Sequence, residues 1–221
     1  MTLKDFWHKI YLEPRRRSLM RRRGIELLKE IDLAMRTHDK PYTLTFGTLL
    51  GAFREKGFIP HDCDVDIAVW ADEDYSEVFK TLESRGFVLK REILVDNGDF
   101  GHEYTYCYKG IDVDFFFMYP MGDGSYYGTE FRDQPGCNNW DESIKEKGGL
   151  HVFRIFLPMR KELESIPFED SSFMVTKDAL GFIEGYYGPN WRVPDPTFVY
   201  PRKGETPYED RPEKLAILKQ Y

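Results

Sequence analysis

Two short segments in which aspartate alternates with apolar residues constrain the fold more than any other feature of this chain. They are Asp64-Val65-Asp66-Ile67 and Asp112-Val113-Asp114-Phe115. Successive side chains of a β-strand point to opposite faces, and same-face Cα atoms lie about 6.6–6.8 Å apart. The two aspartates of each segment therefore share one face, and the apolar residues share the other. We predict two strands that are each buried on one face and acidic on the opposite face.

Carboxylates placed side by side repel each other unless a cation or hydrogen-bond donors neutralise them. Magnesium suits such a pair, because it takes one or two carboxylates and keeps coordination positions for water and phosphate. If the two strands are neighbours, three or four carboxylates converge, which is the requirement for two ions about 3.5–4 Å apart. The alternative is that each pair lies on the solvent face of an edge strand and binds nothing. From the two pairs alone, both interpretations stay open.

A glycine turn precedes the first acidic strand. Gly47 and Thr48 follow the β-prone run 42–46 and open a short helix, with one of the two as its expected N-cap. The free N–H groups and the dipole of a helix start attract phosphate. Arg54 and Lys56 follow at the end of this helix and suit an α- or β-phosphate. Most glycine turns only connect elements, but this spacing lets the turn and a metal address one phosphate chain.

The charge balance narrows the range of partners. The 221 residues carry a net charge of -7, and that acidity excludes general nucleic-acid binding, which needs a dominant positive field. The exception is a basic block, Arg15–Arg23, which contains six arginines. We expect either a solvated helix start or peripheral contact with anionic lipid at the inner face of a membrane.

Cysteine usage and hydropathy indicate the compartment. Cys63, Cys107 and Cys137 are odd in number and lack the spacing of a zinc site or a disulfide framework, which suits a reducing environment. No apolar run approaches the roughly 18 residues of a spanning helix. The segment Met1–Leu12 lacks the apolar region of a signal peptide. We therefore expect a cytoplasmic protein.

Helical and strand-like segments alternate along the chain, which predicts a mixed α/β fold with one main sheet and flanking helices. We expect helices at residues 18–37, 76–85 and 176–187, and strands at residues 65–70, 87–94, 104–108 and 111–118. The Gly-rich stretch 122–149 is expected to be an elaborated loop or lobe. The proline- and charge-rich tail 196–221 is expected to be loosely attached.

The residues around these motifs resemble a known family. The runs from Tyr42 to Arg54 and from Gly57 to Ile67 are similar to the signature of the LicD family, which is related to fukutin and fukutin-related protein. Tyr187-Gly188-Pro189-Asn190-Trp191, followed by Pro194, resembles the closing element of that family. The resemblance covers about residues 24 to 194, and its first block is long and specific.

The resemblance implies a nucleotidyltransferase-like fold of the DNA polymerase β superfamily, a mixed sheet with flanking helices and an elaborated C-terminal part. It implies one catalytic domain at residues 1–195, with a variable acceptor-side segment at about 120–167. It also implies a reaction. A phospho-substituent such as phosphocholine, ribitol phosphate or glycerol phosphate passes from a CDP-activated donor to a hydroxyl of a cell-surface glycan or its lipid-linked precursor.

The resemblance also assigns site residues. Asp64 and Asp66 match the paired aspartates of the family and become metal ligands, while Gly47 and Thr48 match its glycine turn. Asp114 best matches the third carboxylate of the family. We hypothesise two Mg²⁺ ions, with Mn²⁺ as an alternative, held by these three aspartates, and Asp114 as the general base.

Three other residues complete the expected site. Asp112 competes with Asp114 for the third carboxylate and is otherwise a substrate contact. His61 stands where the family usually has tryptophan and is expected to touch substrate. Cys63 stands where the family usually has an acidic residue. These two departures bear on the preference for donor or acceptor rather than on the metal ligands.

Nearby residues carry weaker expectations. Asp62 is expected to support the site from behind the metal ligands. His102 and Glu103 either line the cleft or face water. Tyr187 and Trp191 are expected to pack around a helix end rather than stack on a base.

Three alternative functions remain at this stage. A nucleotidyltransferase that adds NMP to a small molecule or protein would use the same metal geometry, and only its product would distinguish it. A non-catalytic member of the fold would have no reason to keep three aligned aspartates. In a purely structural α/β domain, the repulsion among four aligned acidic side chains would have no explanation.

Overall fold

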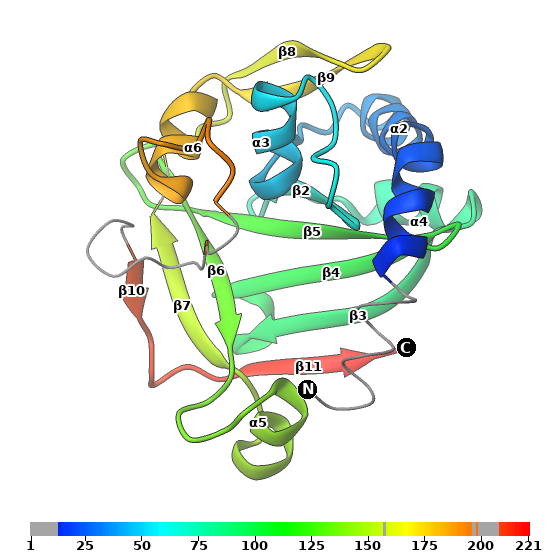
Figure 1. Ribbon diagram of the computed structural model, residues 1–221. Helices are drawn as coiled ribbons and strands as arrows, with labels where there is room; N and C mark the ends of the chain where they lie inside the picture. Colours follow the sequence, from blue (N-terminus) through cyan, green and yellow to red (C-terminus); the bar gives the residue numbers. More distant parts are fainter. Residues whose placement is uncertain (1–12, 157, 196–197, 199–207) are drawn as a thin grey trace.

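The computed structural model describes residues 13–156, 158–195, 198 and 208–221. Met1–Leu12, for which no signal peptide is expected, and Pro196, where the tail begins, lie outside the described residues. In the described part of the chain, nine strands form one curled, largely antiparallel sheet, two strands form a separate hairpin, and helices flank them (Figure 1).

The helices are α2 (Glu13–Thr37), α3 (Phe46–Arg54), α4 (Ser76–Ser84), α5 (Trp140–Lys147) and α6 (Ala179–Tyr187), with a 3₁₀ turn at Asp96–Gly98. The main sheet contains β1 (Thr43–Leu44), β2 (Asp64–Trp70), β3 (Val88–Val95), β4 (Gly101–Tyr108), β5 (Ile111–Pro120), β6 (Tyr126–Arg132), β7 (His151–Phe156), β10 (Tyr208–Asp210) and β11 (Ala216–Gln220). The hairpin is β8 (Leu163–Phe168) and β9 (Ser171–Thr176). The strand order is β10-β7-β6-β5-β4-β3-β11, and β2 joins this path through β5 and pairs with β1.

The two acidic segments form the neighbouring strands β2 and β5, which run parallel. Their apolar faces are buried, since Val65, Val113 and Phe115 are fully shielded from solvent. Phe79 of α4 covers this face, with its ring 5.2 Å from that of Phe115. Long runs of β-branched and aromatic residues favour strands, and a face that is buried fixes their register. The prediction of two half-buried acidic strands is confirmed.

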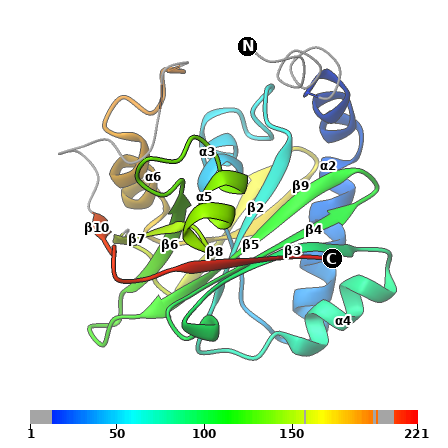
Figure 2. The same cartoon turned by 90° about the horizontal axis from the view of Figure 1, so that it is seen from below.

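The sheet curls so strongly that its two ends approach each other. Leu150, just before β7, forms a bridge with Ala216 at the start of β11, and each donates its N–H to the carbonyl of the other. A small second core is shared by β3, β6, β7 and β11. In Figure 2, β11 runs alongside β3 at the near edge of the sheet. The curl leaves the acidic side of β2 and β5 facing a hollow rather than a flat surface.

The helices lie on different sides of the sheet. Helix α2 packs against α4, β2 and β5, while α3 packs against β2 and α6 (Figure 1). The first residue of α3, Phe46, has the unusual φ of 40°. The rings of Phe116, Phe182 and Tyr186 lie 4.8–5.6 Å from its ring and hold it in place. Positive φ at a bulky residue is costly, so this packing fixes where α3 begins.

Several element boundaries differ from the sequence-based expectation. Thr45, in an extended conformation, is the N-cap of α3, rather than Gly47 or Thr48. The helix expected at 176–187 begins at Ala179, because the preceding residues 171–176 pair with β8. The stretch 122–149, for which an elaborated loop or lobe was expected, contains β6 and α5, and β6 pairs with both β5 and β7.

The prediction of a loosely attached tail is wrong for its described residues 208–221. Strand β10 pairs with β7, and β11 pairs with β3 along its whole length. Ala216 is fully buried in the second core, which explains why this segment docks despite its polar composition. Among the helices that the structure describes, none combines the length and the hydrophobicity needed to cross a membrane.

Candidate active site

The parallel register of β2 and β5 brings the four aspartates together. Asp64 lies opposite Asp112, and Asp66 lies opposite Asp114, with all four on the same side of the sheet. This answers the question that the sequence left open, because the two acidic strands are direct neighbours. Two pairs of carboxylates on adjacent strands are an expensive arrangement unless positive charge meets them.

The start of α3 fixes one of these carboxylates in place. The N–H of Thr48 donates to Oδ2 of Asp66 at 3.2 Å, and the N–H of Asp66 donates to Oγ1 of Thr48 at 2.9 Å. Thr48 is fully buried, so this reciprocal pair is rigid. Thr48 therefore holds a carboxylate in this structure, and its expected contact with phosphate stays a prediction.

Gly47 allows a close approach of two carboxylates. A Cβ atom at this position would lie 3.1 Å from Oδ2 of Asp66 and 3.3 Å from Oδ2 of Asp62. Both distances are tighter than ordinary contact, so a larger residue would push the two side chains away. The glycine turn is thus needed to admit the carboxylates, and Asp62 joins the group as a neighbour of Asp66 rather than standing behind it.

Burial raises the pKa of each of these carboxyl groups, and the charges of neighbouring aspartates add to the shift. Burial, and then the charge of Asp64, raise the pKa of Asp66 well above its usual range. The same two causes raise the pKa of Asp62 to about 7. Burial raises the pKa of Asp114 to about 6, although Arg91 opposes this shift. A bound cation would relieve this repulsion.

Basic side chains that the sequence analysis did not assign to the site meet the β5 aspartates. Arg16 of α2 lies 3.2 Å from a carboxylate oxygen of Asp112, and Lys90 of β3 lies 2.9 Å from both. Arg91 lies 3.5 Å from Asp114. The arginine block drew attention to Arg16 in the sequence, but the direction in which the Arg16 side chain points depends on how α2 packs. Lys90 and Arg91 carry no local signal, because they become neighbours only through the pairing of β3 with β4.

Glu103 and His102 point to opposite sides of β4. Glu103 is buried, and Arg91 donates to it at 3.1 Å, so Arg91 bridges Glu103 and Asp114. Burial and the charge of Asp114 raise the pKa of Glu103 to about 8. His102 instead lies 3.1 Å from Glu92, with its ring stacked on Phe117 on the other face of the sheet. Glu103 therefore belongs to the site, and His102 does not.

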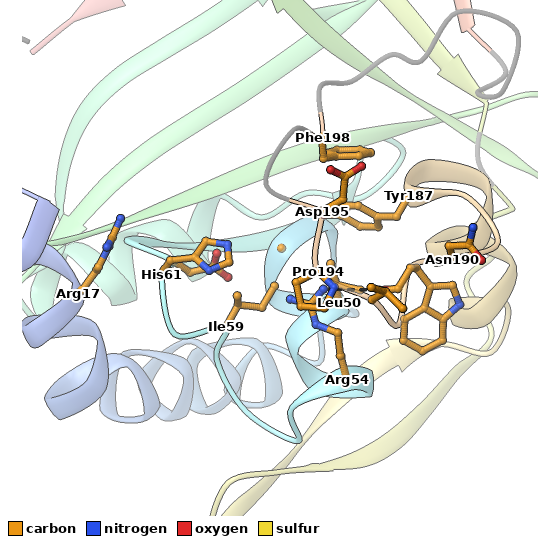
Figure 3. A pocket seen from close by; sticks show the side chains of 14 residues that line it. Arg17, Leu50, Arg54, Ile59, His61, Tyr187, Asn190, Pro194, Asp195 and Phe198 are labelled. Carbon is orange, nitrogen blue, oxygen red and sulfur yellow. Dashed lines mark hydrogen bonds between the residues drawn. The ribbon is translucent and has the colours of Figure 1, made fainter. Parts of the chain in front are cut away.

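A cavity of about 960 Å³ opens beside the glycine turn and is here called the first cavity. Figure 3 shows Arg17 and His61 on one side of it, and Tyr187 and Asn190 on the other. Its remaining lining residues are mainly apolar or aromatic: Gly47, Leu50, Arg54, Ile59, Asp62, Trp191, Val193, Pro194, Asp195 and Phe198. A large cavity with aromatic walls and a few polar groups is typical of a ligand site.

The first cavity places several of the predicted residues. Arg54 lines it, is mostly buried, and donates to the carbonyl of Trp191 at 3.4 Å. Tyr187 and Trp191 form part of its wall, so they pack around the helix end and also face the cavity. Lys56 does not line it. The Lys56 side chain is exposed, and its carbonyl accepts a hydrogen bond from Glu169.

The negative charge of the site residues suits a divalent cation, but their side chains do not converge on one point. In the part of the chain that the structure describes, no group of three His, Cys, Asp or Glu side chains is arranged to hold a metal ion. Asp112 and Asp114 are instead directed toward basic side chains and Thr105. Asp62, Asp64 and Asp66 form no ion pair with any described residue, and burial followed by the charge of a neighbouring aspartate raises the pKa of each.

Comparison with known proteins decides the family. The model of the family described as LicD/FKTN/FKRP, nucleotidyltransferase domain, matches residues 39–178, well over half of the chain. The chain belongs to the LicD/FKTN/FKRP family. The match contains the glycine turn, both acidic strands and the segment between them, so it confirms the resemblance drawn from residues 42–67.

Several curated proteins are similar to this chain. Ribitol-5-phosphate transferase FKTN from Homo sapiens and that from Macaca fascicularis are each 27% identical over 178 residues, which are 78% of this chain and 34% of the relative. The Mus musculus protein of the same name is 24% identical over 183 residues, 81% of this chain and 35% of the relative. An uncharacterised protein from Caenorhabditis elegans is 40% identical over 81 residues, 34% of this chain and 21% of the relative. The chain spans about a third of the length of the FKTN proteins.

Proposed function

We propose that this family member is a metal-dependent transferase that moves a phospho-substituent from a CDP-activated donor to a hydroxyl of a cell-surface glycan or its lipid-linked precursor. Ribitol phosphate is the first candidate for the transferred group, because the FKTN relatives bear that activity in their name. Phosphocholine and glycerol phosphate are the alternatives. The observation that carries the proposal is the register that aligns Asp64 and Asp66 with Asp112 and Asp114 beside the start of α3.

Asp64, Asp66 and Asp114 are the residues proposed to hold Mg²⁺ or Mn²⁺, most simply as two ions. Oxygen ligands of this kind suit hard divalent cations. A bound ion would neutralise the phosphate oxygens and the developing charge on the leaving group. The support for this assignment is chemical, since these buried carboxylates raise one another's pKa and lie beside a cavity large enough for a nucleotide.

The transfer step needs a base that accepts the proton of the hydroxyl group, and it needs the aspartates to be held in fixed positions. The acceptor hydroxyl oxygen forms a bond to the phosphorus that carries the transferred group, the bond from that phosphorus to the CMP oxygen breaks, and CMP leaves. Asp114 takes the hydroxyl proton, and its pKa of about 6 keeps it largely ionised at neutral pH. Thr105 and Arg91 hold Asp114 from the side, and Thr48 holds Asp66.

The first cavity is proposed to hold the nucleotide of the donor. Arg54 and His61 supply polar contacts, and the aromatic wall at Tyr187 and Trp191 suits a base. Exposed arginines 21–23 of α2 face away from the cavity lining and are the part of the basic block that we propose for contact with anionic lipid.

Incubation of the full chain with CDP-ribitol, CDP-choline and CDP-glycerol in Mg²⁺, with chromatographic detection of CMP, tests the proposal. We expect CMP release from at least one donor, and loss of that release in Asp64→Asn and Asp66→Asn. Asp114→Asn with full activity would exclude its role as the base.

The nucleotidyltransferase alternative gives a different product. Incubation with CTP and ATP would then release pyrophosphate, while the CDP-linked donors would remain intact. Absence of CMP from all three donors together with pyrophosphate release would replace the proposed function with this one. A chain that turns over neither class of donor would be a non-catalytic member of the fold.

A further inference from the structure

A second cavity of about 420 Å³ is lined by three of the aspartates, Asp64, Asp112 and Asp114. Its lining comes from α2, β2, β3, β4, β5 and β11, and among the described residues it shares none with the first cavity. The consecutive residues Arg16 and Arg17 separate the two, because Arg16 lines the second and Arg17 lines the first. Likewise, Asp62 faces the first cavity and Asp64 the second.

The two cavities share no described lining residue and so offer separate places for the donor and the acceptor of an in-line transfer. In such a reaction, the attacking and the leaving oxygens lie on opposite sides of the phosphorus. The first cavity is lined in part by α3 and the last residue of α6, and the second is lined in part by β3 and β11. A donor whose nucleotide occupies the first cavity would present its phosphorus near Asp64 and Asp66, with the second cavity open on the far side.

The chemistry of the second cavity differs from that of the first. Its wall contains both basic and acidic side chains, and Thr105 adds a hydroxyl group. Tyr221 is its one aromatic lining residue among those the structure describes. Sugar hydroxyls both donate and accept hydrogen bonds, so a wall with both kinds of partner suits them. A volume of about 420 Å³ lies at the small end of the range for ligand sites, which favours a sugar unit over a nucleotide.

We propose that the second cavity is the acceptor site, that it binds a polyhydroxylated sugar unit, and that the end of β11 forms its outer wall. This inference rests on the proposed function and adds the place where the reacting sugar unit of the acceptor binds. Gln220 pairs with Arg91, and the N–H of Tyr221 donates to the carbonyl of Lys90 at 3.0 Å. These contacts hold both residues beside the basic side chains that reach the aspartates.

The site extends beyond the second cavity along β11. Gln220 also lines a neighbouring hollow between β11 and α5, whose other lining residues include Asp141 and Lys145. A longer saccharide would therefore continue from the reacting unit past Gln220 toward α5. This accounts for the placement of α5, which contributes nothing to the first cavity.

The test separates binding of the acceptor from use of the donor. With CDP-ribitol as donor and a panel of p-nitrophenyl monosaccharide glycosides as acceptors, we expect Gln220→Trp to raise the acceptor KM about tenfold or more by filling the cavity. The donor KM and the slow release of CMP into water should stay within about twofold of the parent chain. Ile217→Ala, an exposed change on the same strand, is the control for the docking of β11.

A second pair of variants addresses the ring of Tyr221. Tyr221→Ala should raise the acceptor KM, whereas Tyr221→Phe, which loses only the hydroxyl bond to Glu92, should leave it unchanged. An unchanged acceptor KM in Gln220→Trp would overturn the inference, as would a rise in the donor KM instead. CMP release into water without transfer to any glycoside would also overturn it. The absence of any donor turnover, by contrast, would refute the proposed function itself.

Discussion

Replacement of Gly47 by alanine should change the free energy of unfolding only slightly but should move the carboxylates of the site. The new Cβ would lie 3.1 Å from Asp66 Oδ2 and 3.3 Å from Asp62 Oδ2, so both carboxylates must shift by a few tenths of an ångström. Alanine is favoured over glycine in a helix by about 1 kcal/mol, while a tight contact costs about 1–3 kcal/mol. We therefore expect the free energy of unfolding to change by less than about 2 kcal/mol.

The effect of Gly47→Ala on activity should be larger than its effect on stability. Misplacement of a reacting group by about 1 Å costs about 10²-fold in rate, so the smaller shift here should lower the kcat for CMP release about tenfold. Stability is measured by urea unfolding, and activity by CMP release from the best CDP-linked donor.

Gly181→Ala is the matched control for this experiment. It also adds a Cβ within a helix, and it also meets an atom at 3.1 Å, but that atom belongs to Pro158, away from the aspartates. It should leave the kcat unchanged. Equal losses of activity in Gly47→Ala and Gly181→Ala, or full activity in Gly47→Ala, would refute the reasoning that Gly47 exists to admit the two carboxylates.

Three further predictions follow from the same contacts. Thr48→Val leaves the buried N–H of Asp66 without its acceptor, so it should lower the free energy of unfolding by about 1–3 kcal/mol, whereas Thr48→Ser should retain most of it in urea titrations. The raised pKa of Glu103 means that its protonated form is the one the fold favours. Its contribution to stability should be complete below about pH 4.5 and lost as the pH rises toward 8. Glu103→Gln should therefore unfold with a weaker pH dependence than the parent chain between pH 5 and 8, and parallel curves would contradict this. Removal of divalent ions with EDTA should abolish CMP release, and added Mg²⁺ should restore it; unchanged release in EDTA would exclude the metal.

The acidic strands could be predicted because their signal is local. An alternation of period two determines which side chains share a face. The face that carries Val65, Val113 and Phe115 is apolar, so it must pack against the core. The sequence did not predict that β2 and β5 are neighbours, because neither strand contains a signal that identifies the strand it pairs with. The same holds for Glu103, whose place in the site depends on the pairing of β4 with β5.

The remaining features depend on contacts between distant segments. The tail appeared loose because residues 208–221 are rich in charge, yet Ala216 completes a core whose other members come from β3, β6 and β7. Arg16 lies 96 residues from Asp112 in the sequence, and only the packing of α2 brings them together. A block of arginines predicts a basic surface, but it does not reveal that two of its members turn inward.

The distribution of these basic residues bears on how an acidic chain can receive an anionic donor. Two like charges 4 Å apart repel by about 4 kcal/mol at an effective dielectric constant of 20, so a diphosphate next to bare carboxylates would be excluded. Arg16 and Lys90 neutralise Asp112, and Arg91 partly neutralises Asp114. Asp62, Asp64 and Asp66 form no ion pair with any described residue, and Asp62 is the one among them that lines the first cavity. The proposed metal would therefore be needed first for the donor to bind, and only then for the chemistry. The cations of α2 and β3, in contrast, keep the far side of the aspartates open to a neutral acceptor.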